Sequence, residues 1–160
     1  MKTLILILLC LSANLQAQIE IDKSPDRWEL DIEAALEKIR VTDTLAYNAI
    51  WDNVNHISYW NGDQSTSDGV RADKGTIRIA RVDLETCSIN KIACVLVHET
   101  HHLTVFRILG RRTQPCTEEI AAYRIELEFI LQLPDAEAFL YKNALEQIKY
   151  YTDQHKLGCR

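Results

Sequence analysis

The sequence predicts an α+β domain that is mainly helical and carries a small β-sheet ahead of its most apolar helix. Apolar residues recur at helical spacing before and after two short β-branched segments, which gives the order helix, helix, strand, strand, helix, helix, helix. The chain has 160 residues, of which 47% are hydrophobic, and this suits one domain with a single core.

The first 17 residues are interpreted as a separate unit. Lys2 precedes an apolar run, and small and polar residues ending in Ala17 follow, which is the order of a secretory signal peptide. The run is too short to span a bilayer, and the leucines before Cys10 disfavour a lipid-modified cysteine there. We predict a signal peptide at 1–17, a single domain at 18–160, a secreted or periplasmic location and no stable membrane insertion after signal removal.

Two helices open the predicted domain. Ser24 and Pro25 suit a helix start, as cap and first helical residue. The apolar stripe that follows consists of Trp28, Ile32, Ala35, Leu36 and Ile39. A second helix is expected to begin near Thr42 or Asp43.

The predicted sheet comes next. Residues 56–60 are β-branched and aromatic, and residues 76–82 alternate apolar and charged side chains, so both are predicted strands, the second with Arg78 and Arg81 near an edge. Residues 61–75 are polar and are expected to form a long loop.

Three helices complete the chain. Residues 90–109 form the most apolar one, with Gly110 as a natural stop. Thr117 is the expected cap of a helix that runs to about residue 133, and a final helix is expected from Pro134 towards Tyr151.

The most apolar helix carries the motif His98-Glu99-Thr100-His101-His102. Residues four apart lie on one face of a helix, so His98 and His102 can bind one Zn²⁺ together. Glu99 can then reach a zinc-bound water without entering the coordination shell, as a general base must. His101 points away from this pair and is read as an outer or surface imidazole.

Residues 95–103 resemble the active-site helix of zincin metallopeptidases. The resemblance implies a small twisted sheet, a later helix that brings a third zinc ligand, and an edge strand, at 76–82, along which a peptide can lie. Val105 and Ile108 exclude the three-histidine metzincin pattern. A gluzincin pattern instead takes a later glutamate, and Glu119 is preferred to its neighbour Glu118.

The resemblance implies an exported zinc-dependent metallopeptidase with one zinc ion, Glu99 as general base, and a peptide or protein substrate. The alternative is a non-catalytic zincin-like protein that binds a metal or a partner. Tyr123 and Glu126 are candidates for orienting a ligand or a reaction oxyanion, although ordinary packing is the simpler reading. The formal net charge of −5 does not suit a nucleic-acid binder.

Four cysteines remain after removal of the signal peptide: Cys87, Cys94, Cys116 and Cys159. An even number in an exported chain predicts up to two disulfides, and the pairing is left open.

Overall fold

The computed structural model describes residues 19–24, 26, 28–60, 66–68, 75–86, 88–111 and 113–159, so the predicted signal peptide lies outside it. The fold is α+β and mainly helical, as the sequence predicts. Its elements are β1 (Glu20–Ile21), α1 (Trp28–Thr42), α2 (Thr44–Asn53), β2 (His56–Trp60), β3 (Thr66–Asp68), β4 (Thr76–Ala80), α3 (Arg81–Thr86), α4 (Ile89–Leu109), α5 (Pro115–Ile130) and α6 (Ala138–Lys156).

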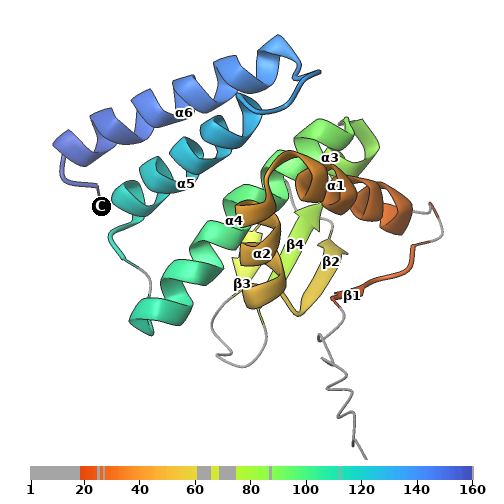
Figure 1. Cartoon of the computed structure of the whole chain (residues 1–160). Helices are drawn as coiled ribbons and strands as arrows, with labels where there is room; N and C mark the ends of the chain where they lie inside the picture. The colour runs from red at the N-terminus through yellow and green to blue at the C-terminus, as the bar shows by residue number, and fades with distance from the viewer. Residues whose placement is uncertain are drawn as a thin grey trace, which may run out of the picture.

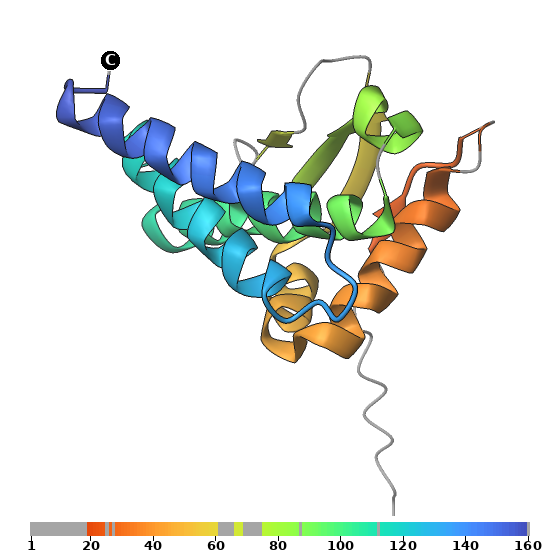
Figure 2. The same cartoon turned by 90° about the horizontal axis from the view of Figure 1, so that it is seen from above.

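The sheet has the strand order β1-β2-β4-β3. Strands β1, β2 and β4 are parallel, and β3 runs antiparallel to β4 at one edge. Helix α4 is central, because α1, α2, α5 and the sheet all contact it (Figure 1). Helix α6 packs along the side of α5, and the two form an antiparallel pair (Figures 1 and 2).

Both ends of α4 are fixed by local interactions. The Ser88 side chain accepts a hydrogen bond from the backbone N–H of Lys91, which caps the first turn. Gly110 ends the helix in the left-handed conformation (φ 65°), where a glycine carries no side-chain penalty. Between these ends nearly every residue from Asn90 to Leu103 is buried, so α4 is held on most of its sides.

One hydrophobic core joins the sheet to the helices. The inward stripe of α1 provides Ile32, Ala35 and Ile39, all at most 1% exposed, as the sequence predicts. Ile57 and Ile77 from the two central strands are equally buried. Each such side chain contributes about 1.5–3 kcal/mol relative to an exposed one, so the sheet and α1 are firmly packed.

The sheet region differs from the predicted one in three ways. The segment expected to be a long loop contains the strand β3, because its backbone pairs with β4 although its residues are polar. The second predicted strand ends at Ala80, and Arg81 begins the helix α3. β4 lies between β2 and β3, so the prediction that residues 76–82 form an edge strand is wrong.

Three helix starts also differ, and the first is that of α1, which begins at Trp28 rather than Pro25. Pro115 opens α5, which places the expected cap Thr117 inside the first turn. Helix α6 begins at Ala138 rather than Pro134, because Pro134 and Asp135 belong to a turn. Within the described residues, no helix is both long and apolar enough to cross a membrane.

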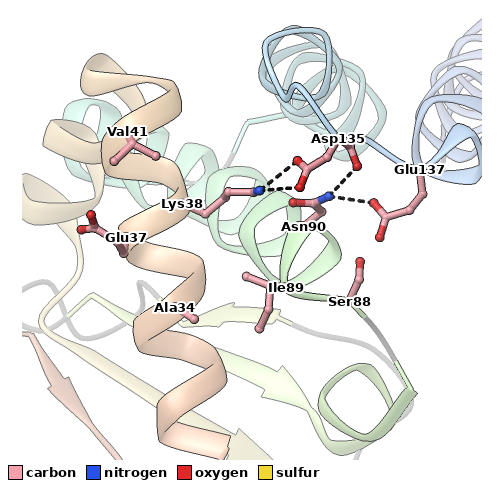
Figure 3. Close-up of a pocket in the computed structure, with 9 residues that line it drawn as sticks. All are labelled: Ala34, Glu37, Lys38, Val41, Ser88, Ile89, Asn90, Asp135 and Glu137. Atoms are coloured by element: carbon pink, nitrogen blue, oxygen red, sulfur yellow. Dashed lines mark hydrogen bonds and ion pairs between the residues drawn. The ribbon is translucent and has the colours of Figure 1, made fainter.

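A polar cluster fixes the turn between α5 and α6 to the rest of the domain (Figure 3). The ammonium of Lys38 in α1 lies 2.8 Å from both carboxylate oxygens of Asp135. Asn90 in α4 donates to the carbonyl oxygen of Asp135 and to the carboxylate of Glu137, each at 3.0 Å. These groups line an open groove of about 590 Å³. The cluster therefore ties this end of the helix pair to α1 and α4.

Candidate metal centre

Three side chains from α4 and α5 converge on one point. His98 and His102 lie one helical turn apart on α4, and their Nε2 atoms are 3.3 Å apart. Glu119 lies in the first turns of α5, with Oε2 3.4 Å from Nε2 of His98 and Oε1 3.5 Å from Nε2 of His102. The sequence predicted these three residues as ligands, and the fold brings them together as a group that can hold a metal ion.

The separations within this group suit a small divalent metal. A tetrahedral ion bound at about 2.0–2.1 Å places neighbouring ligand atoms about 3.3–3.4 Å apart. The 3.3 Å between the two Nε2 atoms matches such an edge, and Glu119 approaches the two nitrogens with its two different oxygens, at 3.4 and 3.5 Å. Two imidazole nitrogens and one carboxylate are also donors that first-row divalent ions accept.

The second nitrogen of each imidazole is held by a carboxylate from α5. Nδ1 of His98 donates to Oε2 of Glu126 at 3.0 Å, and Nδ1 of His102 donates to Oε1 of Glu118 at 2.8 Å. A hydrogen bond at Nδ1 fixes the tautomer and leaves the Nε2 lone pair for a metal. Both rings are therefore oriented towards the centre of the group.

Glu118 is itself held in place. Its Oε2 accepts two hydrogen bonds of 2.8 Å, from the backbone N–H and the hydroxyl of Thr113. The residue is only 4% exposed and lies on the Nδ1 side of His102. Glu119 thus completes the ligand group, and Glu118, the alternative raised by the sequence, orients a ligand. In the sequence, both the ligand and the orienting residue were indicated by the adjacent pair of acids at 118 and 119.

Glu126 has a less complete environment than Glu118. It is 2% exposed, and its Oε1 finds no hydrogen-bond partner among the described residues. The ammonium of Lys91 lies 3.9 Å from Oε1. The thiol of Cys94 is also buried here, and burial together with the charge of Glu126 raises its pKa. The sequence left Glu126 between an orienting role and packing, and the structure gives it the contact with His98.

Glu99 lies beside the ligand group and is 8% exposed. Its negative charge contributes to raising the pKa of both His98 and Tyr123. The Tyr123 ring packs on His98 with a centroid separation of 4.3 Å, and Tyr151 from α6 stacks on Tyr123 at 5.9 Å. Two tyrosines thus form a wall beside the group.

The charges favour a cation at this centre. Burial opposes the charged form of His98, but hydrogen bonds to Glu119 and Glu126 outweigh it and raise the pKa of His98 to about 9. Burial and the nearby His98 lower the pKa of His102, so that this ring is neutral at pH 7. The cationic His98 then contacts Glu119 and Glu126, and the neutral His102 contacts Glu118. The surplus of negative charge disposes the site to a divalent ion.

His101 and His56 lie outside the ligand group. His101 is half-buried, and its ring lies 6.1 Å from that of His102. It lines a small, mostly apolar cavity of about 150 Å³ with residues of α2, α4 and α5. His56 pairs with Asp22 through a contact of 2.9 Å, which links β2 to the chain after β1.

The cysteine pairing is resolved in part. Cys116, in the first turn of α5, forms a disulfide with Cys159, which follows α6. Cys94 is a buried free thiol. Cys87, the fourth cysteine of the predicted set, lies outside the described residues.

Comparisons with protein-family models, with curated proteins and with solved structures give no match. The fold and the site therefore define the class on their own: a mainly helical α+β domain with a candidate centre of two histidines and one glutamate.

Proposed function

We propose that this protein is an exported zinc-dependent metallopeptidase of the gluzincin kind, which hydrolyses peptide or amide bonds. One observation carries the proposal. Glu99 directly follows His98 on the helix that supplies both histidines, and these histidines form with Glu119 a group that can hold a metal ion. Catalytic zinc sites typically use three protein ligands and keep a fourth position open, whereas structural sites use four.

The chemistry expected at such a centre assigns a role to each residue. A bound zinc ion would polarise the scissile carbonyl and lower the pKa of the attacking water to about 7. Glu99 accepts the proton of that water and returns it to the leaving nitrogen. Its burial, at 8% exposed, keeps the carboxylate away from bulk water.

The residues around the ligands keep this arrangement fixed. Glu118 and Glu126 hold the two imidazoles by their Nδ1 atoms, so neither ring needs to turn when a metal binds. Tyr123 packs on His98 and restricts its ring from the side. Supporting groups of this kind reduce the reorganisation that metal binding and catalysis require.

An exported location forms part of the proposal. The pattern of residues 1–17 predicts export, and the Cys116–Cys159 disulfide fits an oxidising compartment.

The test compares zinc content and peptide cleavage in the wild type and in Glu99→Gln. We expect one zinc per chain in both and cleavage of a diverse peptide library by the wild type alone, because the variant lacks the proton acceptor. If both bind zinc and neither cleaves, the non-catalytic metal-binding alternative replaces the peptidase. His102→Ala is the control for the ligands: stoichiometric zinc in this variant would refute the ligand assignment.

A further inference from the structure

The disulfide lies in the same helical turn as the acids of the metal centre. Cys116 precedes Glu118 and Glu119 by two and three residues at the start of α5. It is 2% exposed, and its Cα lies 6.1 Å from the Cα of Cys159, which follows the last helix. Anything that moves Cys116 therefore acts on one ligand and on one orienting carboxylate.

The start of α5 is held by the hydrogen bonds between Thr113 and Glu118 and, at Cys116, by the disulfide. Gln114 occupies the N-cap position, but within the described chain its side chain makes no capping hydrogen bond. The backbone N–H of Cys116 instead donates to Sγ of Cys159 at 3.2 Å. A helix start has backbone donors that need partners, and here a sulfur of the disulfide supplies one.

The C-terminal half of α6 depends on the same link. The fully buried residues of α6, Leu140 and Ala144, both lie in its first half. The polar cluster of Figure 3 fixes the turn before that half. Towards the other end, Tyr151 stacks on Tyr123, and the disulfide joins the chain end to the start of α5 (Figure 1).

We propose that the Cys116–Cys159 disulfide makes metal affinity depend on thiol redox state, with tight binding in the oxidised protein and weak binding in the reduced one. This inference rests on the proposed metal centre. Reduction removes the sulfur from the N–H of Cys116 and releases the end of α6. The first turn of α5 then loosens, and Glu118 and Glu119 lose their fixed distances to His102.

The switching step is ordinary thiol–disulfide exchange with a low-molecular-weight thiol as the reductant. Two such thiols give two electrons and two protons. The S–S bond between Cys116 and Cys159 breaks, both sulfurs become thiols, and the reductant leaves as its own disulfide. The reverse reaction, in an oxidising compartment, completes the metal centre. A chain that is still in a reducing compartment therefore carries a weak site.

The main experiment measures zinc affinity by competition with a chromophoric chelator. The oxidised wild type is compared with Cys116→Ala/Cys159→Ala, which has no thiols at these positions to bind the ion. We expect the affinity to fall on the order of 10–100-fold, as for the loss of groups that orient ligands. Equal affinities in a folded double variant would overturn the inference and leave the metal centre standing. Failure of the oxidised wild type to bind zinc would instead overturn the centre itself, and the inference with it.

Leu140→Ala is the matched control, because it loosens α6 in its first half, where the side chain is 1% exposed. It should lower thermal stability and leave zinc affinity within about threefold of the wild type, since the disulfide remains. A fall as large as that of the double variant would show that general loosening of α6 is the cause, against the proposal.

A second measurement covers the case in which the double variant does not fold. Coupling between two sites is reciprocal, so zinc must favour the disulfide by the factor by which the disulfide favours zinc. The wild type is equilibrated in glutathione redox buffers with and without zinc, and the oxidised fraction is counted by mass spectrometry after alkylation. Zinc should shift the midpoint towards the disulfide; no shift, or a shift towards the thiols, contradicts the proposal.

Discussion

Glu118 holds His102 from the side opposite to the metal centre: its Oε1 lies 2.8 Å from Nδ1, while Nε2 of the same ring faces Glu119 at 3.5 Å. Consecutive acids on α5 thus contact the two nitrogens of one imidazole. A helix turns by about 100° per residue, so neighbouring side chains diverge enough to reach both sides of the ring. Glu118 orients His102 and Glu119 completes the ligand group, so substituting each acid alone separates the two roles.

Glu119→Gln should weaken zinc binding more than Glu118→Gln does. The first change replaces a charged ligand by a neutral amide, whereas the second removes an orienting group, which costs on the order of 10–100-fold in affinity. Competition with a chelator measures both constants under the same conditions. The reverse ranking would move the third ligand by one residue.

Glu118→Gln should also be the more destabilising of the two in the metal-free protein. Its carboxylate accepts from His102 and twice from Thr113, whereas an amide nitrogen cannot accept. One buried donor is left unsatisfied, at a cost of about 1–3 kcal/mol. Urea unfolding with a chelator present checks this, and equal stability of the two variants would contradict it.

Glu126 and Lys91 should be energetically coupled. Lys91→Met removes the cation 3.9 Å from Oε1 of Glu126 and leaves a buried carboxylate without it, so stability should fall by about 1–3 kcal/mol. Adding Glu126→Gln removes that charge, and the double variant should therefore lose less than the sum of the single changes. A double-mutant cycle in urea measures the difference, and strictly additive values would show that the two groups do not interact.

Metal-free stability and zinc affinity should depend on pH in opposite directions through His98. The folded state raises the pKa of this group to about 9, from about 6.5 in an unfolded chain, so it binds the proton more tightly. Its contribution to stability is complete below about pH 6.5 and is lost as the pH rises towards 9. Zinc requires the neutral ring, so affinity rises over the same interval.

Calorimetry tests the prediction that zinc binding requires the neutral form of His98. Zinc titrations near pH 7.5 in buffers of different ionisation enthalpy should show release of about one proton per ion. His98→Gln removes a ligand together with its proton, so zinc binding should weaken and that proton release should be lost, whereas Lys142→Gln on the exposed face of α6 should preserve both. Zinc binding without proton release in the wild type would mean that His98 is already neutral.

The sequence was sufficient where local geometry decides the outcome. His98, Glu99 and His102 could be placed because helical spacing fixes their relation whatever surrounds them. The stripe of α1 and the stop at Gly110 follow from the same local rules. The prediction of Glu119 as the third ligand depended on the resemblance to gluzincins, because its distance from His102 depends on how α5 lies against α4.

The unpredicted features depend on contacts between distant segments. β3 pairs through its backbone with β4, so no apolar alternation marks it. Glu126 reaches His98 across 28 residues, and Cys116 reaches Cys159 across 43, so both contacts depend on the packing of α4, α5 and α6. Arg81 was assigned to the strand because Arg78 alternates with Ile77 and Ile79, although the adjacent apolar pair Ile79 and Ala80 ends that alternation before Arg81.

Gly75→Ala should destabilise the domain by crowding, and its effect should reach α4. A Cβ at this position would lie 1.9 Å from the carbonyl oxygen of Asn53 and 3.2 Å from Leu103, the residue after His102. The backbone must shift to relieve this overlap. Such a shift acts on the hydrogen bonds that the carbonyl oxygen of Gly75 accepts from the N–H groups of Asn55 and His56. We expect a loss of about 1–3 kcal/mol in urea unfolding.

Gly110→Ala is the matched comparison, because a Cβ there meets nothing within 4 Å and the cost of about 1–2 kcal/mol comes from the left-handed backbone at φ 65°. Asparagine tolerates that conformation, so Gly110→Asn should recover part of the loss, whereas Gly75→Asn should be at least as unstable as Gly75→Ala. Stability of Gly75→Ala equal to that of the wild type would mean that the approach of Asn53 is looser than the structure shows. Recovery by asparagine at position 75 would assign the cost there to backbone conformation rather than to crowding.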